Sequence, residues 1–521
     1  MTELARSAEQ QSLSRATDEG ESTVAALEPV AESFEVRNPA TGESVGHYPV
    51  HSADDVAERV AKAREAQTWW AALGFAGRKK RMHRWVRWLA RDCDTLYDIG
   101  FRETGKPKPD VQFELLAGLE DLRWAATHAK RVLGERRVAP GLAMMNFEAR
   151  VSYEPLGVIG VITPWNAPVY TAFCGMAYAL AAGNAVILKP SEYSAATGVY
   201  AAESFYEANP DAPQGLVSWV TGFGETGAAL CRSGVDKLGF TGSVPTGRRV
   251  MSACAEKLTP VLLELGGKDA TVVAEDADLD AAAQSIVWGG MWNSGQACVG
   301  VERVYVVQKV RDEFLCKVKE KAEQVTVGTE PLSDIGPMTL PGQIDIIRRH
   351  VTDALERGGT ALVGGPDSIQ PPYVHPIVLV DVPEESAAVQ EETFGPVVVI
   401  NTVADEDEAV RRANATQFGL GSSVFSKSRG PQIAQRLRAG GTTINSVLTF
   451  VGMPSLPFGG VGDSGFGRFH GDDGLREFAR AKATTRKRFT MGQDMQRFPR
   501  KKEDFDVVHK VVKLRYGRKF R

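Results

Sequence analysis

The sequence predicts an α/β protein with two doubly wound domains, in which helices cover both faces of largely parallel sheets. From Leu156 onward, short apolar runs alternate with helical segments, which is the pattern of a buried parallel sheet. A second series of the same kind starts near Val304. The length of 521 residues leaves room for about two to four domains, and 43% hydrophobic with 24% charged residues is an ordinary globular composition.

The chain before the first series divides into four segments. Residues 1–33 are rich in Ser, Glu, Ala and Gln and have no apolar core of a secretory signal, so we expect a disordered extension. Residues 34–50 predict two short strands around a turn at 38–42. Residues 53–134 repeat apolar side chains at helical spacing, whereas residues 136–153 alternate weakly and predict an exposed pair of strands.

The two alternating series predict the sheets. In the first, strands are expected at residues 158–162, 185–188, 216–220, 238–240 and 261–264, with helices at 172–182, 196–208, around 228–231, and before 261. In the second, strands are expected at 304–307, 360–363 and 397–402, with helices at 311–324 and 408–414. Residues 155–188 carry no charge, but Gly, Pro and Asn interrupt them too often for one membrane-spanning helix.

Charge and cysteine usage exclude several classes of function. A net charge of −4 excludes binding of nucleic acid through the overall charge of the protein, because such binding needs a basic face. The six cysteines are scattered, without CxxC spacing, which is typical of reduced thiols in a cytoplasmic protein. The eight histidines form no ligand spacing, so we expect no catalytic metal.

The last 25 residues are basic. Residues 497–521 contain ten Lys and Arg against three acidic residues, a net charge of +7, beside apolar side chains at 507, 508, 511, 512 and 514. Two interpretations stay open, namely a solvated tail and a helix that contacts a membrane surface or another subunit.

Three glycine-bearing turns follow predicted strands. Residues 222–227 fit G-x-G-x-x-G, residues 240–243 open a helix at Ser243, and residues 264–268 place Glu264 at a strand end beside two glycines. The carboxyl ends of parallel strands are where open α/β sheets bind ligands. Each turn alone is equally compatible with an ordinary turn or an N-cap.

A polar turn precedes Cys298. Residues 293–298 read Asn-Ser-Gly-Gln-Ala-Cys between apolar segments, which suits either a reactive thiolate or a buried structural cysteine. No local Cys/His signature accompanies it, so a papain-like protease is not indicated.

Seven motifs in order resemble the aldehyde dehydrogenase superfamily, from about residue 34 to about residue 489. They lie at residues 164–166, 188–192, 240–243, 263–268, 295–298, 391–396 and 457–460. Their joint occurrence is far more specific than any one of them.

The resemblance implies a covalent mechanism. Cys298 would attack the aldehyde carbon, Asn166 and the Cys298 backbone N–H would hold the oxyanion, and Glu264 would activate the water that hydrolyses the thioester. A carboxylate at position 264 argues against a CoA-acylating relative. The trio together argues against a non-enzymatic binding protein that kept the fold.

The resemblance also implies a nicotinamide cofactor. Lys189 and Glu192 match positions that contact the adenosine ribose, and because the Glu192 carboxylate would repel a 2′-phosphate, NAD is favoured over NADP. The full expected set of cofactor residues is Ile162, Thr163, Pro164, Trp165, Lys189, Ser191, Glu192, Gly222, Gly224, Phe240, Thr241, Gly242, Ser243, Leu265, Gly266, Glu392 and Phe394.

The expected substrate tunnel is apolar. By resemblance it is lined by Tyr170, Phe173, Cys174, Val299, Phe450 and Phe458. The lysine and glutamate that many relatives carry nearby are Gly175 and Phe469 here, so a proton relay through that pair is not carried over. Succinate semialdehyde, fatty aldehydes and aromatic aldehydes all stay open as substrates.

The family's fold implies a division of the chain. We expect a nucleotide-binding domain at 34–134 and 155–266 and a catalytic domain at 267–481. A strand arm is expected at 135–154 and 482–490, followed by the basic tail at 491–521. Because exposed strands are managed by pairing, the arm predicts a homodimer or homotetramer.

Overall fold

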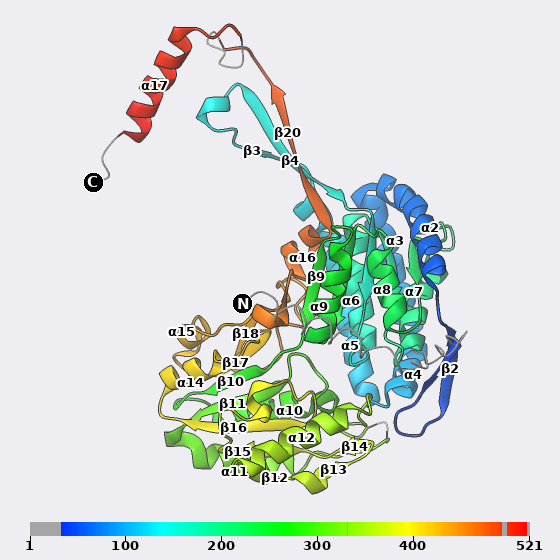
Figure 1. Cartoon of the computed structure of the whole chain (residues 1–521), viewed down its shortest axis with the longest axis vertical. Helices are drawn as coiled ribbons and strands as arrows, with labels where there is room; N and C mark the ends of the chain where they lie inside the picture. The colour runs from blue at the N-terminus through cyan, green and yellow to red at the C-terminus, as the bar shows by residue number, and fades with distance from the viewer. Residues whose placement is uncertain (1–32, 331, 492–497, 518–521) are drawn as a thin grey trace, which may run out of the picture.

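The computed structural model describes residues 33–330, 332–491 and 498–517 (Figure 1). The predicted disordered extension lies outside these residues, apart from Ser33. Strands β1 (Ser33–Arg37) and β2 (Ser44–Pro49) form the predicted antiparallel pair. Four helices follow, α2 (Ala53–Ala72), α3 (Gly74–Arg91), α4 (Cys93–Thr104) and α5 (Lys108–Leu133).

Local chemistry explains where these helices start and stop. Ser52 and Asp55 form a reciprocal capping box at the start of α2. Gly105, in the left-handed region at φ 69°, ends α4. Two tryptophans anchor the helices to the next layer, because the indole N–H of Trp70 donates to the Leu180 carbonyl and that of Trp85 to the Ser204 hydroxyl, both at 2.8 Å.

The first large sheet has six strands in the order β19-β9-β8-β5-β6-β7. Its strands are β5 (Val158–Ile162), β6 (Ala185–Lys189), β7 (Val217–Trp219), β8 (Lys237–Gly242), β9 (Val261–Leu265) and β19 (Gly465–Phe466). Helices α6 (Pro168–Ala182), α7 (Ala195–Ala208), α8 (Gly224–Arg232) and α9 (Val244–Ala255) connect them. The charge-free stretch is therefore a strand, a buried helix and a second strand, as predicted, and all pairs are parallel except β19 with β9.

The second large sheet has seven strands in the order β12-β15-β16-β11-β10-β17-β18. They are β10 (Asp269–Val273), β11 (Val301–Val307), β12 (Thr360–Val363), β15 (Ile377–Val380), β16 (Val397–Val403), β17 (Gly421–Phe425) and β18 (Gly441–Ile444). Only β12 is antiparallel to its neighbour. Sequence patterns predicted β11, β12 and β16 but missed β10, β15, β17 and β18.

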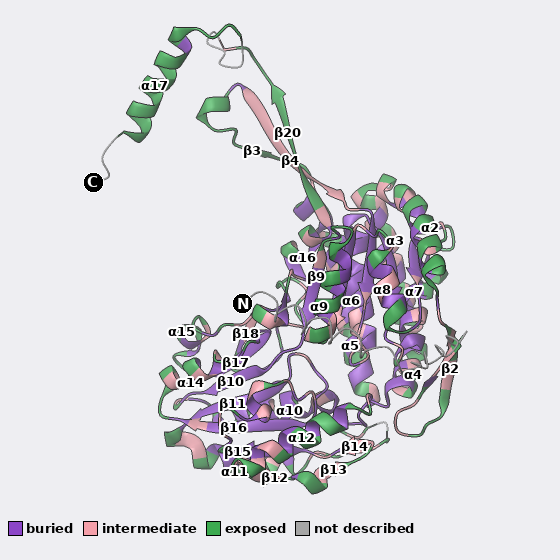
Figure 2. Cartoon of the chain, in the orientation of Figure 1, coloured by how far each residue is buried: buried purple, intermediate pink, exposed green. Residues whose placement is uncertain are grey.

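Helices and short segments complete this half of the molecule. The helices are α10 (Leu279–Met291), α11 (Arg311–Ala322), α12 (Gln343–Glu356), α13 (Ala387–Gln390), α14 (Glu406–Ala413) and α15 (Gly430–Ala434). The last helix before the arm, α16 (Gly471–Glu477), packs instead against α5 and α6 of the first half. The hairpin β13 (Ile369–Gln370) with β14 (Tyr373–Val374) is separate. Figure 2 shows that the strands of both sheets are largely buried under the helices, which is the layered arrangement that the alternating pattern predicts.

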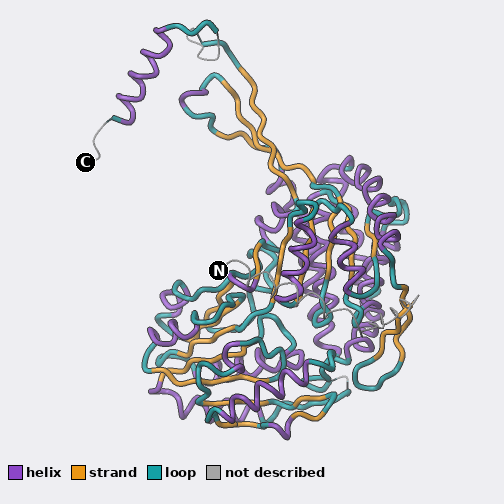
Figure 3. The backbone as a smooth tube through the Cα atoms, viewed as in Figure 1, coloured by secondary structure: helices purple, strands orange, loops and turns teal. Residues whose placement is uncertain are grey.

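A three-stranded arm projects from the body (Figure 3). Strand β4 (Phe147–Pro155) lies between β3 (Arg136–Val138) and β20 (Ala479–Lys487), all antiparallel. The predicted pair of strands is thus completed by β20, whose bounds begin three residues before the expected 482. Beyond it, α17 (Lys502–Tyr516) stands away from the body with its valines at 507, 508, 511 and 512 exposed. A docking role for this helix stays a prediction.

Among the described residues, none of the helices combines the length and the apolarity that crossing a membrane would require.

Candidate active site

A cavity of about 1240 Å³ lies where the carboxyl ends of the first sheet's parallel strands meet the loop before β11. Its lining includes all three predicted catalytic residues, Cys298, Glu264 and Asn166. It also includes every predicted cofactor residue except Gly222, and four of the six predicted substrate residues, Tyr170, Cys174, Val299 and Phe458.

Three predicted residues lie away from this cavity. Phe173 is completely buried on the opposite side of α6, with its ring 5.5 Å from that of Trp85. Phe450 packs behind Phe458, at 6.1 Å between ring centroids. Gly222 sits at φ 140°, where a Cβ would lie 2.3 Å from the Thr226 hydroxyl, so its role is to make the turn before α8. The structure therefore places these three residues outside the cavity lining, and their contacts with a ligand stay predictions.

Cys298 follows a tightly folded loop. The preceding 3-10 turn, Trp292–Gly295, contains Asn293 and Ser294 in the left-handed region, and Gly295 has φ 69°. A Cβ at Gly295 would lie 2.0 Å from the Gly395 carbonyl oxygen, so only glycine fits. The loop therefore lies in close contact with the backbone at Gly395, and this contact fixes the position of the Cys298 thiol at the cavity.

Side-chain amides hold the same loop from the other side. The Asn166 side-chain amide donates to the Gln296 backbone carbonyl at 2.9 Å, and the Asn166 backbone carbonyl accepts from the Asn293 side-chain amide at 2.8 Å and from Lys106 Nζ at 2.5 Å. Lys106 also pairs with buried Glu114 at 2.5 Å. Because an amide carries two N–H bonds, Asn166 can contact the loop and still present a second donor.

The Cys298 thiol lies in acidic surroundings. Burial, followed by the charges of Glu264, Glu392 and Asp269, raises the pKa of Cys298 well above its usual value. The protonated thiol is therefore the resting form of this side chain. A positive charge placed beside it would favour the thiolate.

Glu264 is a buried acid near the end of β9. Its backbone is paired with Thr241 of β8 and Gly465 of β19, which leaves little freedom of position. The side chain is 1% exposed, and its Oε1 has no hydrogen-bond partner within the described structure. Burial first, then the charges of Glu392 and Asp269, raises the pKa of Glu264 well above its usual value. A buried carboxyl of raised pKa in a cavity is a typical general base.

The nucleotide-type residues surround the rest of the cavity. Ser243 is the N-cap residue of α9, but its hydroxyl donates to the Thr246 hydroxyl at 3.0 Å and accepts from none of the backbone N–H groups of the helix, so the free N–H groups at the start of α9 suit an anion. Lys189 and Glu192 lie at and after the end of β6, and burial lowers the pKa of Lys189. These residues fit the phosphate and ribose groups of a dinucleotide.

Glu392 and two aromatic rings form the opposite wall. The Gly267 N–H donates to Glu392 Oε1 at 2.9 Å, and burial raises the pKa of Glu392 to about 8. The rings of Trp165 and Phe394 meet edge to face at 5.6 Å. Gly266 allows the Glu392 carboxylate to lie directly against the backbone, since a Cβ there would clash with it.

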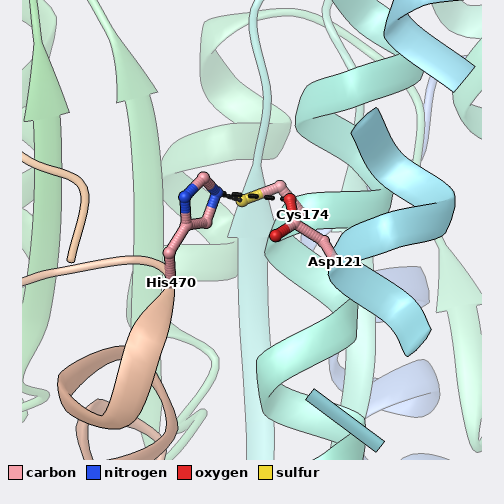
Figure 4. A group of neighbouring side chains, drawn as sticks. All are labelled: Asp121, Cys174 and His470. Atoms are coloured by element: carbon pink, nitrogen blue, oxygen red, sulfur yellow. Dashed lines mark hydrogen bonds and ion pairs between the residues drawn. The ribbon is translucent and has the colours of Figure 1, made fainter. Parts of the chain in front are cut away.

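The structure places Cys174, a predicted substrate residue, beside Asp121 and His470, which sequence reasoning missed. Asp121, Cys174 and His470 offer one ligand-type atom each within 4.8 Å of one another, and all three are buried (Figure 4). Lys106, Glu114 and Gln296 were also missed. The expectation of no metal rested on spacing along the chain, which cannot detect such a cluster, and that expectation stays a prediction.

Comparison with known proteins identifies the family of this chain. A model of the aldehyde dehydrogenase family matches residues 27–484. The chain is 37% identical over 484 residues to a 4,4'-diapolycopene aldehyde oxidase of Methylomonas sp, covering 92% of this chain and 91% of that protein.

Solved structures of aldehyde dehydrogenases are also similar to this chain. An aldehyde dehydrogenase of Mycobacterium tuberculosis complexed with NAD+ has 33% identity and a TM-score of 0.82, over 89% of this chain and 96% of that one. A succinate-semialdehyde dehydrogenase from Burkholderia pseudomallei has 32% identity and a TM-score of 0.82, over 87% of this chain and 94% of that one.

Proposed function

Because the chain belongs to the aldehyde dehydrogenase family, we propose that it oxidises an aldehyde to a carboxylate through a covalent intermediate on Cys298, with NAD+ as hydride acceptor. The observation that carries this proposal is that Cys298, Glu264 and Asn166 line one cavity together with the nucleotide-type residues. A purely structural cysteine would not require an unpartnered buried acid in the same cavity.

Bond formation starts at sulfur. The Cys298 thiol loses its proton and attacks the aldehyde carbon, which forms a C–S bond and an oxyanion. The second N–H of Asn166 and the backbone N–H of Cys298 stabilise that oxyanion, and loss of one such donor costs about 3 kcal/mol. The product of this step is a thiohemiacetal on Cys298.

Hydride transfer and hydrolysis complete the cycle. Glu392 and Phe394 would hold a nicotinamide ring in this cavity, and that ring would supply the acceptor for the hydride that leaves the former aldehyde carbon. The remaining thioester is attacked by water, from which Glu264 removes a proton, and the C–S bond breaks. The overall balance is aldehyde, NAD+ and water in, with carboxylate, NADH and two protons out.

The choice of NAD+ over NADP+ rests on Glu192. A carboxylate beyond β6 accepts hydrogen bonds from a ribose 2′-hydroxyl and repels a 2′-phosphate. Lys189 lines the same part of the cavity, and its positive charge could bind a 2′-phosphate. NADP+ is therefore the alternative cofactor to measure.

We also propose a homo-oligomer built through the arm. Within the described residues, β20 pairs only with β4, so its other edge has no strand beside it from Ala479 to Arg486. Pairing with another copy of the chain would satisfy that edge.

The function is tested by NADH formation with succinate semialdehyde, aromatic aldehydes and long aliphatic aldehydes. Turnover is expected with at least one class, and addition of CoA should leave its rate unchanged. Cys298→Ala should abolish turnover while NAD+ still binds by calorimetry. Full activity of that variant would refute the nucleophile assignment.

A further inference from the structure

A buried polar cluster adjoins the wall of the cavity next to Cys298. His470 Nε2 lies 2.8 Å from the Tyr170 hydroxyl, 3.2 Å from Asp121 Oδ2 and 3.4 Å from Cys174 Sγ. Tyr170 and Cys174 line the cavity, whereas Asp121 and His470 stand behind them. Figure 4 shows Asp121, Cys174 and His470 converging from α5, α6 and the residue that precedes α16.

His470 is held in an unfavourable conformation. Its φ of 60° and ψ of 164° belong to a region that glycine almost alone adopts, which costs about 1–3 kcal/mol. The ring is completely buried, and its Nδ1 has no partner in the described structure. Tyr178 and Phe458 stack on its two faces, at 5.7 and 5.5 Å between centroids. The structure therefore maintains an imidazole where glycine would be relaxed.

The surrounding oxygens select one tautomer. Protonation of Nε2 lets this nitrogen donate to the Tyr170 oxygen, and it places the N–H beside the Asp121 carboxylate, whose Oδ2 lies 3.2 Å away and accepts no hydrogen bond in the described structure. Protonation of Nδ1 instead would bury an N–H without an acceptor and face the Nε2 lone pair toward the carboxylate. Asp121 is itself fixed, because its Oδ1 accepts from the Tyr178 hydroxyl at 2.9 Å. The Nε2–H tautomer is favoured on both grounds.

This tautomer sets the direction of the Tyr170 hydroxyl. Since the Tyr170 oxygen accepts from His470, its own hydrogen is directed elsewhere, and the Val451 carbonyl offers only a contact of 3.5 Å. Burial raises the pKa of Tyr170 well above its usual value, so the hydroxyl keeps its proton. Because Tyr170 also lines the cavity, a substrate oxygen bound there could replace the long contact with Val451 as the acceptor of this hydrogen.

The other side chains of this wall are uncharged. They are Cys174, Val299, Val451, Phe458 and Phe469. The cations that line the cavity, Lys189, Arg248, Arg249 and Arg349, come from β6, α9 and α12, which carry none of these residues. A substrate carboxylate would thus find no cation on this wall.

We propose that Asp121 and His470 are positioning residues that orient Tyr170 as a hydrogen-bond donor to an uncharged aldehyde carrying an acceptor oxygen, such as an ether, hydroxyl or carbonyl. The inference rests on the proposed aldehyde oxidation. It narrows the substrate class of that site to neutral, oxygen-bearing aldehydes with an apolar or aromatic skeleton.

A bound metal is the competing explanation of the cluster. Histidines that ligate a metal almost always donate their second ring N–H to a partner, and Nδ1 of His470 has none. The hydrogen-bond interpretation needs no such partner, so we favour it, and metal content is measured as part of the test.

The test compares matched substrates. Methoxy- and ethyl-substituted benzaldehydes have nearly the same shape, but only the methoxy member carries an acceptor oxygen. The ratio of kcat/KM between the members of each 2-, 3- and 4-substituted pair is measured for wild type, Tyr170→Phe, His470→Gly and His470→Gln. His128→Gln is the matched control, because His128 bonds the Trp124 carbonyl on α5 and does not line the cavity.

For at least one pair, the methoxy-to-ethyl ratio should fall about fivefold in Tyr170→Phe and in His470→Gly, the worth of one neutral hydrogen bond. His470→Gln, which keeps an N–H donor, should restore part of the ratio, and the control should match wild type. Thermal melting and NAD+ binding establish that each variant is folded. If His470→Gly does not fold, the result for Tyr170→Phe, which is the mildest change, decides the test.

Three outcomes would overturn the inference. They are a ratio unchanged in Tyr170→Phe for every pair, a ratio unchanged in folded His470→Gly, and one equivalent of metal in the purified protein that Cys174→Ser removes. Absence of NADH formation from every aldehyde in wild type is a different result, because it refutes the proposed function itself.

Discussion

Replacing Glu264 with Gln removes the proposed base with little change in shape. The side chain is almost fully buried, and its Oε1 bonds to nothing in the described structure, so an amide of the same shape can take the place of the carboxyl group. Formation of the C–S bond and loss of hydride do not require this base, whereas hydrolysis of the thioester does. We therefore expect a burst of one NADH per active site, followed by slow turnover.

The size of the effect follows from the role. Loss of a general base slows its step about 10²- to 10⁴-fold, so steady turnover of Glu264→Gln should fall by that factor. A second effect follows from charge. After burial, Glu264 is the largest cause that raises the pKa of Cys298. Its neutral replacement should lower that pKa, and the burst rate should reach its maximum at lower pH than in wild type.

Stopped-flow absorbance of NADH over a pH series measures both effects, and mass spectrometry after acid quench detects the thioester on Cys298. Glu320→Gln, on an exposed position of α11, is the matched control and should behave as wild type. Steady turnover of Glu264→Gln near the wild-type rate would refute its role as base. An unchanged pH profile of the burst would refute the electrostatic coupling of Glu264 to the thiol.

The other two predictions concern the nucleophile loop and the cofactor. Gly295→Ala forces a Cβ to within 2.0 Å of the Gly395 carbonyl oxygen at φ 69°, so we expect a loss of about 2–4 kcal/mol in unfolding free energy and at least a tenfold lower burst rate. Urea unfolding and stopped-flow kinetics measure these, and a wild-type burst rate would show that the loop tolerates displacement. Glu192→Thr should raise the ratio of kcat/KM for NADP+ to that for NAD+ about tenfold, because a carboxylate that repels a 2′-phosphate is removed. An unaltered ratio in steady-state assays would exclude Glu192 from cofactor choice.

Strands buried on both faces were predictable where their sequences are apolar. Val158–Ile162 and Ala185–Lys189 are strands in the structure because their apolar side chains contact helices on both sides of the sheet. Strand Gly421–Phe425 reads Gly-Ser-Ser-Val-Phe and Gly441–Ile444 reads Gly-Thr-Thr-Ile, which resemble loops. They become strands because β10 already offers an edge for β17 to pair with, and β17 then offers one to β18.

Cys298 and Glu264 could each be identified from the sequence alone. Each lies in a recognisable local segment, which is a polar turn for Cys298 and a strand end for Glu264. The cavity that joins them, 34 positions apart, exists only because two sheets meet there. Likewise, helical spacing could not say that Phe173 faces the core while Tyr170 faces the cavity.

The contact between His470 and Asp121 is the clearest example of what the sequence could not predict. Local propensity and hydrophobic pattern act over a few residues, and they settle which segments are helix, strand or turn. Contacts between segments hundreds of residues apart depend on how whole layers pack, and only packing places an imidazole in a strained backbone beside that carboxylate and the Tyr170 hydroxyl. The sequence therefore determined which reactive side chains the protein has. The folded structure decided which of these side chains contact one another.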